Sequence, residues 1–166
     1  MKQYYKIVQF KEAIYCLILL CLFSACDEEQ DTNEVEGRIV QNFNANWNFQ
    51  LGEHPEAKND SIDLSNWRKL DVPHDWSIEG EFSEEHPTKP EGGALPAGIG
   101  WDRKTFKVPE DWNNRNVFIS FDGIYRNSEV WVNGEYLGKR PFGYISFQYD
   151  LTPFIKFGES NVIAVK

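Results

Sequence analysis

The sequence predicts an all-β protein, a sandwich or jelly roll, behind a short N-terminal leader. Three observations indicate this fold class. Short segments alternate apolar and polar residues, tight turns rich in Gly, Pro and Asn separate them, and no window beyond the leader keeps a helical period. The 166 residues are 41% hydrophobic and 15% aromatic, which is enough for one domain with an apolar core.

The charge of the chain bears on its partners. The formal net charge is -9, and lysines and arginines are scattered rather than gathered in a run. A nucleic-acid-binding domain needs a basic surface for the phosphate backbone. We therefore expect no nucleic-acid partner.

Residues 1–25 have the pattern of a lipoprotein signal peptide. Lysines precede an apolar stretch at 13–23, which is too short to span a bilayer comfortably but suits the apolar part of an export signal. The sequence L-F-S-A-C then resembles a bacterial lipoprotein cleavage box, with Cys26 as the lipid-bearing residue. An ordinary export signal with an incidental cysteine is the alternative. We expect an exported lipoprotein, in the outer membrane or periplasm or at the cell surface.

Residues 26–37 form an acidic linker. In Bacteroidetes such an acidic stretch behind the lipidated cysteine resembles a surface-export signal, and a solvated tether fits the composition equally. Cys16 and Cys21 lie in the leader and would leave with it. The mature domain would therefore have no disulfide, thiolate nucleophile or cysteine metal site, and would depend on its apolar core.

The strands are predicted from alternation. In N-W-N-F-Q-L the side chains of Trp47, Phe49 and Leu51 share one face. In S-E-V-W-V-N-G the dipeptide Asn133-Gly134 suits the two positive-φ positions of a type I′ hairpin turn. Further strands are expected over residues 117–122, with 117, 119 and 121 on one face, and over 135–137, 144–149 and 161–166.

Proline and glycine mark the connections. A proline-led turn is expected at residues 109–112 and a capped single turn at 150–153. Residues 82–100 contain three prolines and four glycines and are long for an unstructured connection. Loops of that length are usually functional or disordered. We expect a surface loop that reaches toward a partner domain or a ligand.

Five motifs follow one another along the chain. They are V-P-H-D-W-S-I-E-G at 72–80, G-I-G-W-D-R-K-T-F at 98–106, F-D-G-I-Y-R-N-S-E-V-W-V-N-G at 121–134, R-P-F-G-Y at 140–144 and Y-D-L-T-P-F at 149–154. In this order they resemble the N-terminal sugar-binding domain of glycoside hydrolase family 2. The resemblance is greatest to bacterial β-galactosidases, with β-glucuronidases and β-mannosidases as further relatives. It covers about residues 39–166, and D-G-x-x-x-N-S-E-V-W-V-N-G is its most specific string.

The resemblance implies a jelly-roll, galactose-binding-like sandwich of about eight strands over residues 38–166. It also implies a following immunoglobulin-like domain and a TIM barrel that carries the two catalytic glutamates of a retaining hydrolase of β-galactosides. This chain would then lack catalytic residues. Because it stops within the predicted strand 161–166, we expect it to be C-terminally truncated.

The resemblance and the residue types suggest roles for a few motif positions. Trp131 is expected to pack between the two sheets. His74, Asp75 and Trp76 are the candidates for contact with sugar, since the polar pair could bind a hydroxyl and the indole could stack on a ring. They could equally anchor the loop or face the barrel.

Two departures from the family pattern affect the implied contacts. In related β-galactosidases the loop before the strand at 101–106 reaches the active-site rim. Here residues 95–100 lack the polar side chain that some members have there. An aromatic residue is common in the family where this chain has Asp102.

The sequence offers no catalytic pair, cofactor motif or metal-ligand spacing. Retaining glycosidases need two carboxyl groups about 5–5.5 Å apart, one with a raised pKa. The carboxylate candidates fall mostly near turns, and the three histidines have no metal-binding spacing. The sequence leaves open whether the full-length enzyme binds Ca²⁺ or Na⁺. The carboxylates are Asp75, Glu79, Glu81, Asp102 and Asp122, and the histidines are His54, His74 and His86.

Two alternatives to a glycosidase domain that contacts substrate remain. One is a stand-alone carbohydrate-binding surface lipoprotein without hydrolase activity. The other is a scaffold domain that contacts only its own barrel.

Overall fold

The computed structural model describes residues 37–88 and 93–166. Residues Asn42–Lys166 form one compact unit, and residues 37–41 belong to a separate unit and contain neither helix nor strand. The predicted signal peptide, Cys26 and nearly all of the acidic linker lie outside the described residues. Within the described ranges, no helix has the length and apolar character needed to cross a bilayer.

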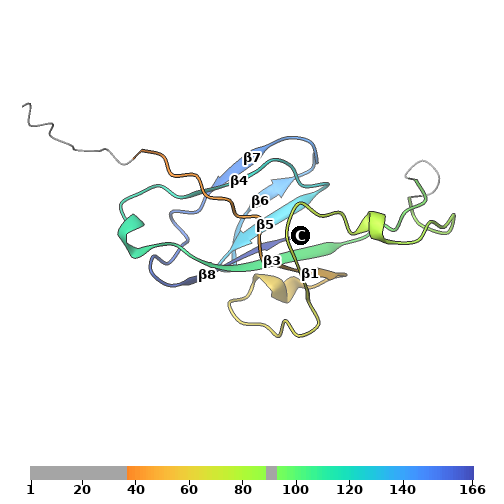
Figure 1. Cartoon of the computed structure of the whole chain (residues 1–166), viewed down its shortest axis with the longest axis horizontal. Helices are drawn as coiled ribbons and strands as arrows, with labels where there is room; N and C mark the ends of the chain where they lie inside the picture. Colours follow the sequence, from red (N-terminus) through yellow and green to blue (C-terminus); the bar gives the residue numbers. More distant parts are fainter. Residues whose placement is uncertain (1–36, 89–92) are drawn as a thin grey trace, which may run out of the picture. The chain divides into compact units, whose positions relative to one another are not determined.

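The described residues form eight strands and short 3-10 turns (Figure 1). All strand pairs are antiparallel. Six strands form one sheet in the order β2-β1-β3-β8-β5-β6, and β4 pairs with β7 in a second sheet. The strands are β1 (Trp47–Leu51), β2 (Arg68–Leu70), β3 (Gly100–Lys107), β4 (Phe118–Phe121), β5 (Ser128–Val132), β6 (Glu135–Arg140), β7 (Phe147–Asp150) and β8 (Ser160–Val165).

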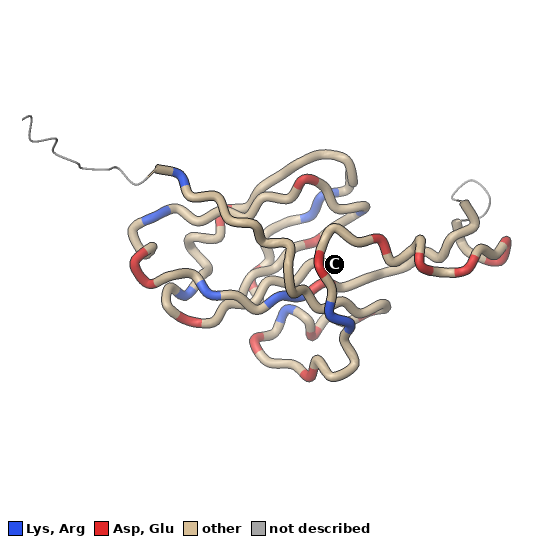
Figure 2. The backbone as a smooth tube through the Cα atoms, viewed as in Figure 1, with Lys and Arg blue, Asp and Glu red and all other residues tan. Residues whose placement is uncertain are grey.

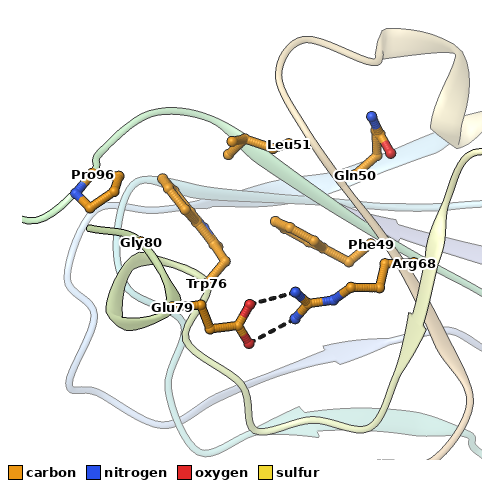
Figure 3. Close-up of a pocket in the computed structure, with 8 residues that line it drawn as sticks. All are labelled: Phe49, Gln50, Leu51, Arg68, Trp76, Glu79, Gly80 and Pro96. Carbon is orange, nitrogen blue, oxygen red and sulfur yellow. Dashed lines mark hydrogen bonds and ion pairs between the residues drawn. The ribbon is translucent and has the colours of Figure 1, made fainter.

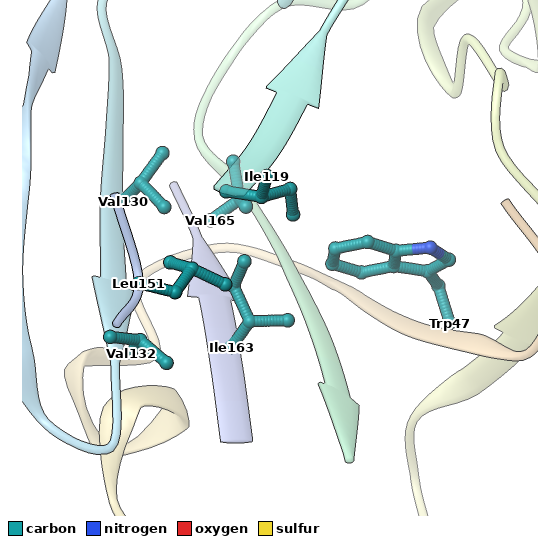
Figure 4. Close-up of a cluster of buried hydrophobic side chains, with 7 residues drawn as sticks. All are labelled: Trp47, Ile119, Val130, Val132, Leu151, Ile163 and Val165. Carbon is teal, nitrogen blue, oxygen red and sulfur yellow. The ribbon is translucent and has the colours of Figure 1, made fainter. Parts of the chain in front are cut away.

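The main core lies between the two sheets, which confirms the prediction of an all-β sandwich. The large sheet contributes side chains from β1, β5 and β8, and the small sheet contributes Ile119 from β4 and Leu151 directly after β7 (Figure 4). Each buried aliphatic side chain stabilises the fold by about 1.5–3 kcal/mol. The finer jelly-roll subdivision stays a prediction. The buried set is Trp47, Ile119, Val130, Val132, Leu151, Ile163 and Val165.

The other face of the large sheet is also covered. The segment between β1 and β2 carries the 3-10 turn η1 (Pro55–Lys58), and its fully buried Ala57 packs with Trp101 and Ala164. Trp131 stacks on Trp101 with ring centroids 5.1 Å apart. The expectation that Trp131 packs between the sheets is therefore wrong. Side chains alternate along β5, so Val130 and Val132 lie on the inner face, toward the second sheet, and Trp131 lies on the outer face.

Arg103 fastens the η1 segment to the sheet. Its side chain is 2% exposed, and its guanidinium donates hydrogen bonds to the carbonyl oxygens of Ala57, Asn59 and Asp60 at 3.0–3.1 Å. Burial lowers the pKa of Arg103, and the nearby Asp60 carboxylate opposes that shift. The donor geometry of guanidinium explains how one side chain satisfies three backbone acceptors.

The turns follow their predicted chemistry. Asn133 and Gly134 have φ of 48° and 86° and join β5 to β6, as expected for a type I′ hairpin. The backbone N–H of Thr152 donates to the Asp150 carboxylate at 2.9 Å, which caps the turn after β7. The predicted proline-led turn is the 3-10 turn η4 (Glu110–Trp112).

The long connection between η2 (Ser77–Glu79) and β3 has no helix or strand in its described parts, as expected. It leaves the sheets and projects beyond them (Figure 1). The end of the connection that leads into β3 is held by a hydrogen bond from the Ser77 hydroxyl to the Pro96 carbonyl oxygen at 2.6 Å. This hydrogen bond positions Pro96 at the surface near the start of β3.

Candidate functional site

The segment that follows β2 lies against the ends of β1 and β3. His74 packs edge-on against Phe49, with ring centroids 4.7 Å apart, and its Nε2 atom is 3.5 Å from Asp102 Oδ1. The His74 side chain is 12% exposed. A side chain this enclosed holds the segment in place and cannot offer its ring to a sugar without moving.

Asp75 has a local role in the structure. Its carboxylate accepts the backbone N–H of Ser77 at 2.9 Å, two residues along the chain. Such a bond is the usual way in which aspartate fixes a turn. Asp75 therefore shapes the entry into η2.

Of the three candidates, Trp76 lines a pocket at the start of β3 that neither His74 nor Asp75 lines. The pocket has a volume of about 380 Å³ (Figure 3). The indole lies beside Phe49 with ring centroids 6.5 Å apart and planes inclined by 24°. The wall is mostly apolar, and its residues come from β1, β2, η2 and the returning loop. They are Phe49, Gln50, Leu51, Arg68, Trp76, Glu79, Gly80 and Pro96.

An ion pair closes one side of this Trp76 pocket. Both guanidinium NH groups of Arg68 donate to the two carboxylate oxygens of Glu79, one of them at 2.9 Å (Figure 3). The hydrogen bond from Arg68 holds the pKa of Glu79 below its ordinary value, and the same bond raises the pKa of Arg68. Both groups are therefore charged at neutral pH, and their bidentate geometry is fixed.

Close packing at the pocket requires glycine at Gly100. A Cβ atom there would lie 2.7 Å from the Phe49 ring and 3.3 Å from the Trp76 indole nitrogen. Carbon atoms at 2.7 Å overlap strongly, so any side chain would push the Phe49 ring away. The start of β3 can approach both rings only because the residue has no side chain.

The described residues show no side-chain cluster suited to binding a metal ion. They contain no group of three or more His, Cys, Asp or Glu side chains that could hold a metal ion. Glu79 is paired with Arg68, Asp75 caps a turn and Asp102 faces His74. The carboxylates that the sequence offered thus have local partners in three cases, and the prediction of no catalytic residue here stays a prediction.

Sequence reasoning missed Arg68, Pro96 and the partner role of Glu79. Arg68 comes to the pocket because β1 and β2 pair in a register that sets it opposite Phe49. Pro96 arrives through its bond with Ser77. No local pattern marks either residue, because each depends on pairing between distant segments.

The comparisons with known proteins concern nearly all of the described chain. Residues 40–166 match the model of "Glycosyl hydrolases family 2, sugar binding domain". A β-galactosidase of Bacteroides ovatus is 52% identical over 132 residues, which are 80% of this chain and 16% of that protein. A putative β-glucuronidase of Formosa agariphila is 45% identical over 156 residues, which are 93% of this chain and 14% of that protein.

A solved structure is likewise similar to most of this chain and to a small part of a longer glycosidase. A β-glycosidase from Bacteroides vulgatus is 54% identical with a TM-score of 0.71, and the match covers 75% of this chain and 16% of that one. The chain thus spans about a sixth of the length of the relatives it matches. Their names divide between β-galactosidase and β-glucuronidase, so they agree on a glycosidase and differ on the sugar.

Proposed function

We propose that this chain, which belongs to glycosyl hydrolase family 2 and forms its N-terminal sugar-binding domain, is part of a longer retaining glycosidase that acts on β-galactosides. The main support is the 52% identity with a β-galactosidase over most of the domain. The matched region covers only 16% of these relatives, which supports additional domains in the parent protein. We propose that these are an immunoglobulin-like domain and a TIM barrel that carries the catalytic glutamates.

The test is hydrolysis by the parent protein. We expect 4-nitrophenyl β-galactoside to be cleaved with a kcat/KM at least about tenfold above that for 4-nitrophenyl β-glucuronide, a difference of about 1.4 kcal/mol in transition-state stabilisation. The first product should keep the β configuration, as a retaining mechanism requires. Preferred cleavage of the glucuronide would refute the assignment to β-galactosides. The 166-residue chain alone should cleave neither.

We also propose that the parent is exported as a lipoprotein with its lipid on Cys26 and its domain outside the inner membrane. The support is the leader pattern L-F-S-A-C at residues 22–26. Cys26→Ala should move the protein from the membrane fraction to the soluble fraction of the periplasm or medium. An unchanged membrane fraction in the variant would count against lipidation at this residue.

The alternative of a stand-alone carbohydrate-binding lipoprotein is favoured by one observation, the pocket lined by Trp76. The two proposals predict different gene products. The alternative would be supported if the gene encodes this domain alone and the protein binds glycans at the cell surface without cleaving them.

A further inference from the structure

We propose that Asn133 is a modification site controlled by folding. Its amide is protected from deamidation while the domain is folded and reacts once the chain unfolds, and the product prevents the β5–β6 turn from re-forming. This property goes beyond the glycosidase function and does not depend on it. Deamidation at Asn133 would make an excursion to the unfolded state irreversible.

The reaction follows from the dipeptide itself. Asn133-Gly134 is the one Asn-Gly pair in the chain, and the backbone nitrogen of glycine is easily approached because the residue has no side chain. The Gly134 nitrogen forms a bond to Asn133 Cγ while the Cγ–Nδ2 bond breaks, and the proton of the Gly134 amide leaves with the ammonia. Water then opens the cyclic imide at either carbonyl and gives aspartate or isoaspartate, with no change in oxidation state.

The fold leaves the turn accessible to water. Asn133 is partly buried and Gly134 is exposed. Among the described residues outside its immediate chain neighbours, a Cβ atom at Gly134 would meet only the Lys58 carbonyl oxygen, at 3.8 Å. Protection in the folded state therefore has to come from the bonds that the Asn133 side chain makes, since steric exclusion does not supply it.

Three hydrogen bonds hold the Asn133 amide in place. Nδ2 donates to the Phe154 carbonyl oxygen and to Asn161 Oδ1, both at 2.8 Å. Oδ1 accepts the backbone N–H of Val162 at 2.9 Å. Ring closure requires Cγ to become tetrahedral and Nδ2 to leave, so these bonds must break first. If each bond slows the reaction by a factor of about five, the folded chain should deamidate roughly a hundredfold more slowly than the unfolded chain.

The same partners would reject the product. A carboxylate oxygen in place of Nδ2 would face the Phe154 carbonyl oxygen and Asn161 Oδ1, which are both acceptors. Asn161 cannot turn its amide to offer a donor without losing its bonds to the N–H and carbonyl of Lys156. Isoaspartate would also lengthen the backbone of a two-residue turn whose geometry sets the hairpin.

The product also changes the charge of the protein. Deamidation adds one negative charge to a chain whose formal net charge is already -9 and whose acidic residues are spread along the backbone (Figure 2). The new carboxylate would gain no hydrogen-bond donor in place of the two that the amide supplied. A chain that has reacted while unfolded should therefore refold poorly.

The test compares deamidation of the full chain in native buffer and in urea, followed by peptide mass spectrometry with separation of isoaspartate. Conversion at Asn133 should be at least about a hundredfold slower in native buffer than in urea. Asn114→Gly supplies the matched control, because it places a glycine after Asn113 in an exposed turn. In the folded variant Asn113 should react at least about tenfold faster than Asn133, and in urea the two should react alike.

Two results would overturn the modification site. Equal rates at Asn133 in native buffer and in urea would show that the three hydrogen bonds do not protect it. A chain in urea that reacts at Asn113 and not at Asn133 would show that the Asn-Gly pair of the turn is not a reactive site.

The effect on folding is measured on the same samples. The fraction that refolds after dilution from urea, followed by tryptophan fluorescence, should fall in step with the fraction of Asn133 converted. Gly134→Ala slows the reaction in urea because its methyl group hinders attack by the nitrogen, so its refolded fraction should stay constant over the same incubation. Asn133→Asp should be less stable than Asn114→Asp, which adds the same charge at an exposed position. Complete refolding of fully converted chains would refute the claim that the product is rejected.

Discussion

Replacing Asn161 with alanine should destabilise the fold more than a typical polar substitution does. Asn161 is fully buried at the start of β8. Its Oδ1 accepts the backbone N–H of Lys156 at 2.7 Å and the Asn133 side-chain amide at 2.8 Å. Its Nδ2 donates to the carbonyls of Lys156 at 2.8 Å and Glu159 at 3.3 Å. One side chain thus satisfies four hydrogen-bonding groups beside the hairpin turn.

The magnitude follows from those four bonds. At about 1 kcal/mol for each net hydrogen bond, Asn161→Ala should cost roughly 4 kcal/mol, and groups left buried without a partner raise the cost further. Asn133 is the group most affected, because its own Oδ1 accepts the Val162 N–H at 2.9 Å and its amide must keep its orientation. The loss of hydrogen bonds at Asn161 should therefore also destabilise the β5–β6 turn, where Asn133 lies.

The assay is urea unfolding of the full chain, followed by tryptophan fluorescence, with the free energy extrapolated to water. Asn113→Ala is the matched control, because Asn113 is exposed, and it should change the free energy by no more than about 0.5 kcal/mol. A loss below about 1 kcal/mol for Asn161→Ala, at an unchanged m-value, would show that water or rearranged neighbours replace these bonds and would refute the reasoning.

Two further predictions concern the hairpin turn and the ion pair. Gly134→Ala should destabilise the chain by about 1–2 kcal/mol, since φ at Gly134 is +86° and a side chain disfavours that region; Gly37→Ala, with open space around it, should be neutral in the same urea experiment. The pKa of Glu79 is lowered in the folded state, so the pair stabilises the fold above the unfolded pKa of about 4.3 and loses this effect as the pH falls through the lower folded value. The stability difference between wild type and Glu79→Gln should therefore shrink between pH 6 and pH 3, and a difference that stays constant with pH would contradict this linkage.

Local chemistry made several features predictable. Asn133-Gly134 adopts positive φ at both positions because few other dipeptides can. The alternation at β1 correctly set Trp47 and Phe49 on one buried face. It also set Leu51 there, but β1 ends at Leu51 and leaves it half exposed at the pocket.

Alternation alone could not say which face of β5 meets the second sheet. Both faces of the large sheet are covered, one by β4 and β7 and the other by the η1 segment. An apolar residue is therefore expected on either side, and Trp131 was assigned to the wrong one. The decision depends on where residues 52–67 fold back, which no local pattern encodes.

The candidate site shows the same division. The motif H-D-W marked the right stretch of chain, but the structure gives its members different roles. His74 is enclosed by Phe49 and Asp102, Asp75 caps a turn, and only Trp76 opens onto the pocket. Adjacent residues point in different directions, so a contiguous motif seldom shares one function.

The sequence by itself determined the fold class, the hairpin turn and the family, because alternation, positive-φ residues and ordered motifs are properties of neighbouring positions. Only the tertiary structure decided which aromatic residues are buried on which face, and which side chains form the pocket. Strand register set Arg68 opposite Phe49, and the Ser77–Pro96 hydrogen bond brought the far end of the long loop back to Trp76. Each of those contacts joins residues 19 positions apart, and their energies depend on the whole sheet being assembled first.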